Sequence, residues 1–145
     1  MNRILGIDAG ERRIGVAISD PDRRFALPLR SIDASGGEEA IARIVEGEEV
    51  TEIVVGLPLS LSGEASAQTE RARAFGRRLE ERLGLPVRFW DERLSTQEAM
   101  RLGGGDRGGR GRERRARRAP MDTDSIAASV ILQAFLDRMR FERES

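Results

Sequence analysis

The chain has 145 residues and no net charge, because 25 basic residues, all of them arginine, balance 25 acidic residues. It contains no cysteine, histidine, lysine or tyrosine, which excludes disulfides, thiolate or imidazole metal sites and Cys, His, Lys or Tyr nucleophiles. Chemistry must therefore come from carboxylates, hydroxyls, arginines and a bound hard metal ion. The length suits one domain over residues 1–145. No stretch approaches the roughly 20 apolar residues of a membrane span, so we expect a soluble protein with no membrane partner.

The first part of the chain predicts a meander of three strands. Residues 3–8 read as a short buried strand that ends in a carboxylate, and a turn at residues 9–10 leads into a second strand over residues 14–18. A third strand covers residues 25–31, where Pro28 indicates an edge or irregular strand. Residues 38–49 have helical spacing, and residues 52–56 read as a strand buried on both faces.

The second part predicts helices around one further strand. After a loop over residues 57–65, a long amphipathic helix covers residues 66–83 and is closed by Gly84, and the last strand covers residues 86–91. Ser95 and Glu98 form a capping-box pattern that opens a short helix. Residues 103–111 are rich in glycine and predict a flexible loop, and the final helix runs from 123 to about 140. This order predicts an α/β fold with a mixed five-stranded sheet flanked by helices.

Asp8 is the most distinctive acidic residue. In a strand it shares one face with Ile4 and Gly6, while Leu5 and Ile7 take the other face. A carboxylate at the carboxyl end of a buried strand lies where α/β proteins place their ligands. The alternative is a turn-forming aspartate, which is common at strand ends.

The last strand and the last helix contribute further acids. Asp91 and Glu92 end the strand, and the pattern leaves open which of them faces inward; a surface ion pair is the alternative. Asp124 begins a stripe of positions i, i+4, i+7 and i+11 that should pack on the sheet, so its side chain should point toward the sheet edge. Asp122 lies off that stripe, and we assign it the helix cap.

Carboxylates at three element ends are the ligands that Mg²⁺ or Mn²⁺ prefers. Two such ions, about 4 Å apart, can activate a water and stabilise the leaving oxygen of a phosphodiester. This chemistry needs none of the residue types that the chain lacks. We therefore predict a metal-dependent nuclease with Asp8, Asp91, Glu92 and Asp124 as candidate catalytic acids, of which Asp8, Glu92 and Asp124 are the expected metal ligands.

Four motifs, at residues 6–20, 53–59 with Gly63, 91–96 and 124–133, resemble the YqgF family in their order, and the match runs over nearly the whole chain. This family comprises bacterial pre-16S rRNA nucleases that are also described as Holliday-junction resolvases. The resemblance implies an RNase H-like fold related to the RuvC resolvases, an Mg²⁺ or Mn²⁺ cofactor, a cytoplasmic location and a role in ribosome biogenesis. It also implies that Asp8 is the catalytic acid of the first strand and Asp124 that of the helix.

Arginines are the candidates for binding the nucleic acid. Arg13 and Arg93 match motif positions. They are candidates for binding phosphate; the alternative is that they form ion pairs that stabilise the site. Residues 101–118 carry a net charge of +6, from eight arginines and two acids. We expect this segment to contact phosphates without reading bases, or else to be a solvated loop. Its candidate residues are Arg110, Arg112, Arg114, Arg115, Arg117 and Arg118.

The pattern leaves the substrate open between structured RNA, such as pre-16S rRNA, and branched DNA, because recognition of shape leaves little trace in motifs. A homodimer would suit an enzyme that cuts two strands. A catalytically silent nucleic-acid-binding module is the main alternative from another class. An actin-like ATPase is a weaker alternative, because those enzymes clamp ATP between two domains of this kind.

Overall fold

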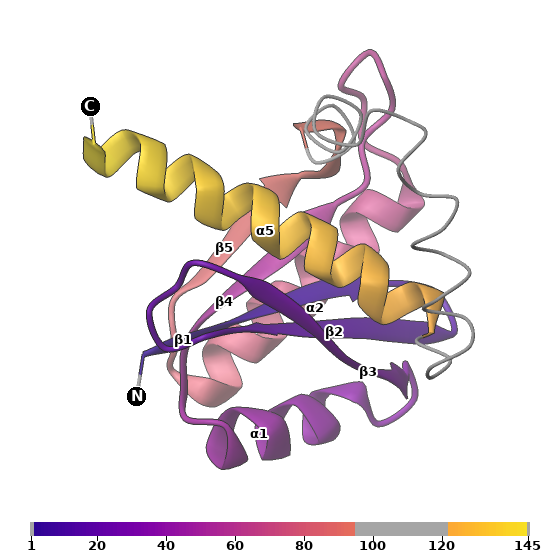
Figure 1. Ribbon diagram of the computed structural model, residues 1–145. Helices are drawn as coiled ribbons and strands as arrows, with labels where there is room; N and C mark the ends of the chain where they lie inside the picture. The colour runs from indigo at the N-terminus through magenta and orange to yellow at the C-terminus, as the bar shows by residue number, and fades with distance from the viewer. Residues whose placement is uncertain (1, 95–121, 145) are drawn as a thin grey trace.

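The computed structural model describes residues 2–94 and 122–144. Its strands are β1 (Arg3–Ala9), β2 (Arg13–Ser19), β3 (Ala26–Asp33), β4 (Val50–Leu57) and β5 (Val87–Asp91). The helices with both ends among the described residues are α1 (Gly37–Gly47), α2 (Ala67–Leu83) and α5 (Thr123–Glu144). The strands form one sheet in the order β3-β2-β1-β4-β5 (Figure 1). β1, β2 and β3 pair antiparallel, whereas β4 pairs parallel with β1 and with β5, which confirms the predicted mixed five-stranded sheet.

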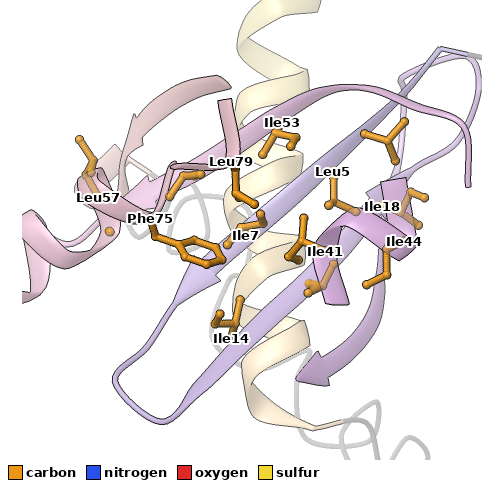
Figure 2. Close-up of a cluster of buried hydrophobic side chains, with 14 residues drawn as sticks. Leu5, Ile7, Ile14, Ile18, Ile41, Ile44, Ile53, Leu57, Phe75 and Leu79 are labelled. Atoms are coloured by element: carbon orange, nitrogen blue, oxygen red, sulfur yellow. The ribbon is translucent and has the colours of Figure 1, made fainter. Parts of the chain in front are cut away.

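The larger hydrophobic core lies between the sheet and the helices α1 and α2. Leu5 and Ile7 of β1 pack there with Ile41 of α1 and with Phe75 and Leu79 of α2 (Figure 2). All five side chains are buried. Each helix presents its apolar face to this side of the sheet, which explains the spacing of apolar residues from which the two helices were predicted.

A second core fills the opposite face of the sheet, which α5 crosses (Figure 1). Ile4 of β1 and Val54 of β4 pack there against Ala128 and Ile131 of α5. Neighbouring residues of a strand point to opposite faces. Asp8 therefore shares the α5 side of the sheet with Ile4, as the alternation in the sequence predicted.

The ends of α2 and the position of β3 follow local rules. Ser66 and Thr69 form a capping box, in which the Thr69 N–H donates to Ser66 Oγ at 3.3 Å and the Ser66 N–H donates to Thr69 Oγ1 at 2.9 Å. Gly84 ends the helix with a φ of 68°. Pro28 lies on β3 at the edge of the sheet, beside a shift in the β2–β3 register. These features confirm the predicted helix bounds and edge strand.

Two predicted elements, the short helix opened by Ser95 and the arginine-rich segment 101–118, lie outside the described residues. The final helix extends to Glu144, beyond its predicted end near 140. None of the helices in the described ranges is long and apolar enough to cross a membrane.

Candidate active site

Asp8 lies in a row of residues that crosses the sheet on the side of α5. Its partner on β2 is Gly15, and the partner of Gly15 on β3 is Ser31. On the other side of β1, Ile7 pairs with Val55 of β4, so the following residue, Gly56, is beside Asp8. Residues paired across strands point to the same face of a sheet. Asp8 is thus flanked on both neighbouring strands by glycines, which leave the space beside it open.

Asp124 occupies the space over Gly15. A Cβ atom at Gly15 would lie 1.9 Å from the carbonyl oxygen of Asp124 and 3.0 Å from its Cβ. No side chain fits in such a contact with backbone, so the first turn of α5 approaches β2 only because position 15 is glycine. This contact brings the carboxylate of Asp124 close enough to Asp8 for the two charges to interact.

Glu92 occupies the corresponding space over Gly56. A Cβ atom at Gly56 would lie 2.7 Å from Cδ1 of Ile131, 3.1 Å from Cγ of Glu92 and 3.2 Å from its carboxyl carbon. Glu92 therefore folds back from the end of β5 over β4, on the face that α5 covers. The sheet places Asp8 between two acids, with Asp124 on one side and Glu92 on the other.

Burial and the repulsion of neighbouring charges make Asp8 and Glu92 reluctant to ionise. Burial raises the pKa of Asp8, and the charge of Asp124 raises it further. Burial raises the pKa of Glu92 from 4.5 to about 7, and the charges of Asp8 and Asp91 add to this effect. Half-buried carboxylates that repel one another are what a bound cation would stabilise in the ionised form.

Asp91 has a different environment, in an ion pair with Arg93. The Nε of Arg93 lies 3.0 Å from each carboxylate oxygen of Asp91, and the Arg93 N–H donates to Asp91 Oδ1 at 2.9 Å. These contacts, chiefly the side-chain hydrogen bond, lower the pKa of Asp91. Arg93 also donates from Nη1 to the carbonyl of Leu61 at 3.3 Å, so it ties the loop after β4 to the end of β5.

The other predicted residues fall into three groups. Arg13 opens β2 beside the turn that follows Asp8, and its side chain is exposed. Among the described residues no carboxylate is within ion-pair distance of Arg13. Asp122 caps α5, because its Oδ1 accepts from the Ser125 N–H at 2.7 Å, as predicted. The arginines from Arg110 to Arg118 lie outside the described residues.

Three residues that shape the site are absent from the sequence prediction: Gly15, Gly56 and Ser31. An isolated glycine inside a buried strand is a signal of close approach, and it would have marked Gly15 and Gly56. Ser31 donates from Oγ to Oδ2 of Asp124 at 3.2 Å. No local pattern marks Ser31, because it joins the site only through the β2–β3 register.

The donor set fits a hard divalent cation. All the side chains at the centre of the site are oxygen ligands, and Asp8 is repelled by both neighbours. As they stand, no three acidic side chains of residues 2–94 and 122–144 already form a complete metal-binding cluster. Asp124 and Glu92 stand over β2 and β4, about two strand spacings or roughly 10 Å apart, with Asp8 between them. Asp8 is therefore the central acid of the three.

The raised pKa of Glu92 gives a stability test. The folded state holds the proton of Glu92 more tightly than the unfolded state, so stability is full below pH 4.5 and falls as pH rises toward about 7. Gln carries no charge to desolvate. We expect Glu92→Gln to raise the unfolding free energy of the metal-free protein at pH 8 by about 1 to 2 kcal/mol, after discounting for partial exposure. The gain should shrink as the pH is lowered toward 5.

Asp91→Asn is the matched control, measured with Glu92→Gln by urea unfolding in EDTA at pH 5 and pH 8. The lowered pKa of Asp91 means that its charge stabilises the fold at both pH values. We therefore expect Asp91→Asn to be less stable than wild type at both. If Glu92→Gln is less stable than wild type at pH 8, then the ionised Glu92 carboxylate does not destabilise the fold.

The fold belongs to the RNase H-like class. RuvC of T. thermophilus, solved in complex with a Holliday junction substrate, superposes with a TM-score of 0.67 over 98% of this chain and 97% of that chain, at 13% identity. The fowlpox virus Holliday junction resolvase gives a TM-score of 0.53 over 94% of this chain and 99% of that one, also at 13% identity. These likenesses confirm the predicted RuvC-like fold.

The sequence comparisons narrow the class to a family. Residues 2–138 match the family model described as RuvX: Holliday junction resolvase. A protein of Koribacter versatilis named "Putative pre-16S rRNA nuclease" is 41% identical over 145 residues, or 98% of this chain and 91% of the relative. A protein of the same name from Chloroflexus aurantiacus is 42% identical over 140 residues, or 94% of this chain and 88% of the relative. The chain belongs to this family, which confirms the resemblance of its four motifs.

Proposed function

We propose that this chain is a divalent-metal-dependent endonuclease that acts on the precursor of 16S rRNA. The family to which it belongs is one of nucleases. The observation that carries the metal-dependent mechanism is the position of Asp8 between Glu92 and Asp124 on one face of the sheet. We assign these three acids as the metal ligands and Asp91 as the partner of Arg93.

The chain's own residues would prepare the site as follows. Asp8, on a central strand, would hold the divalent metal together with Glu92 and Asp124, which lie on either side of it. A bound Mg²⁺ or Mn²⁺ would supply the charge that activates water and stabilises the leaving oxygen. Arg13, exposed beside the turn after Asp8, would bind a substrate phosphate with its planar guanidinium.

The arrangement argues against a silent nucleic-acid-binding module. The raised pKa values of Asp8 and Glu92 mean that their charged forms cost stability, and the negative charge of the acids would repel phosphate. A module that only bound RNA or DNA would gain nothing from them. The actin-like ATPase alternative needs a second domain of this fold, whereas the relatives matched along most of their length carry the name of nucleases.

The names of the relatives, pre-16S rRNA nucleases, support RNA as the substrate. The description of the family, Holliday junction resolvase, supports branched DNA. The test is a side-by-side cleavage assay in Mg²⁺ on a pre-16S rRNA fragment and a synthetic four-way junction. We expect the RNA to be cut at defined positions at least ~10-fold faster, a difference of about 1.4 kcal/mol in transition-state free energy. Faster cutting of the junction would favour the resolvase, and cleavage of neither would favour the silent module.

Arg110, Arg112, Arg114, Arg115, Arg117 and Arg118 would contact backbone phosphates of the substrate. Arg93 is held by Asp91, so its role in binding nucleic acid would be indirect, through the loop that contains Leu61. We also propose that the protein works in the cytoplasm, and that a homodimer would be needed only if it cuts two strands.

A further inference from the structure

Ser31 reaches the active site from β3, the edge strand of the sheet. Its partner on β2 is Gly15, and because position 15 has no side chain, nothing at this position separates Ser31 from the helix above. The Ser31 hydroxyl donates to Oδ2 of Asp124 at 3.2 Å. A residue of β3 therefore holds a carboxylate at the start of α5.

The hydrogen bond from Ser31 to Asp124 opposes the repulsion between Asp124 and Asp8. Asp124 and Asp8 repel each other, which favours rotation of the Asp124 side chain away from β1. A donor from Ser31 to one carboxylate oxygen restrains that rotation and leaves the other oxygen available. Among the described residues, Ser31 is the one side chain with a hydrogen bond to Asp124. Groups that orient a metal-binding carboxylate in this way are a general feature of metal sites.

We propose that Ser31 is a positioning residue, whose hydroxyl holds the Asp124 carboxylate in the orientation that faces Asp8 and thereby sets the affinity of the site for a divalent cation. This inference rests on the proposed function only in taking Asp124 as a metal ligand. It adds a role for β3, a strand that carries none of the site acids.

The test measures the Mn²⁺ affinity of the wild-type chain, Ser31→Ala and Ser31→Thr by isothermal titration calorimetry. Alanine removes the donor, whereas threonine keeps a hydroxyl on the same carbon. We expect Ser31→Ala to weaken Mn²⁺ binding by about 10-fold, the lower end of the range for such positioning groups, and Ser31→Thr to restore most of the affinity. Cleavage by Ser31→Ala should recover at saturating Mn²⁺, because the reacting groups themselves are intact.

Ser19→Ala is the matched control. Ser19 is a buried serine at the far end of β2, four residues beyond Gly15, where its Oγ accepts from the Ile4 N–H at 2.9 Å and donates to the Asp20 carbonyl at 3.0 Å. Its loss should lower the melting temperature and leave the Mn²⁺ affinity unchanged. If Ser31→Ala binds Mn²⁺ as wild type does, or if Ser19→Ala weakens binding equally, the positioning role is wrong.

The outcomes separate this inference from the proposed function. A wild-type protein that binds Mn²⁺ but cleaves neither substrate refutes the nuclease proposal, while a 10-fold affinity ratio between wild type and Ser31→Ala still supports the role of Ser31. A wild-type protein that binds no Mn²⁺ overturns both. A protein that cleaves RNA in Mn²⁺ with unchanged affinity in Ser31→Ala supports the function and refutes the inference.

Discussion

Asp8→Asn should lower cleavage by at least ~10²-fold while substrate binding stays intact or becomes tighter. Asp8 lies between the other two acids, so its substitution would remove the central ligand of the proposed metal site. Removing its charge also removes repulsion against the substrate phosphate, which is why affinity should not fall. Asp124→Asn should behave in the same way.

The measurement is single-turnover cleavage together with equilibrium binding of the same substrate. Asp33→Asn is a matched control, because Asp33 is an exposed acid at the end of β3. Asp33→Asn should cleave at the wild-type rate. Activity near wild type in Asp8→Asn or Asp124→Asn would mean that the site lies elsewhere.

Removal of divalent metal is the second large effect. In EDTA we expect cleavage to vanish, and Mg²⁺ or Mn²⁺ to restore it, because the chain has no histidine, lysine, cysteine or tyrosine that could replace the ion as a source of activated nucleophile. Ca²⁺ should support substrate binding without turnover, because it accepts the same oxygen ligands with looser geometry. The assay is cleavage and binding in each ion after dialysis against EDTA.

The metal requirement should depend on pH. The pKa of Glu92 is about 7 in the metal-free protein, so an ion must displace a proton below that pH. The Mg²⁺ concentration needed for half-maximal cleavage should therefore rise as the pH falls from 8 to 6. Full activity in EDTA at any of these pH values would exclude the mechanism.

Short-range patterns were sufficient for most of the fold and for two of the acids. The alternation of β1 correctly placed Asp8 on the face opposite Leu5 and Ile7, because side chains of a strand alternate strictly. The apolar stripe of α5 likewise indicated that Asp124 points to the sheet. Ala128, the next position of that stripe, is fully buried against the strands.

The sequence by itself therefore determined the mixed sheet, the order of elements along the chain, the family, and the faces on which Asp8 and Asp124 lie, because their neighbours have a clear periodicity. The different surroundings of Asp91 and Glu92, on which their proposed roles rest, appear only in the tertiary structure. Arg93 forms an ion pair with Asp91. Gly56 has no side chain, which leaves room for Glu92 beside Asp8. Ser31 likewise reaches the site only through the tertiary structure, because the β2–β3 register places it beside Gly15. Periodicity reports which face a residue takes within its own element, whereas the neighbours of that face depend on register and packing between elements far apart in the chain.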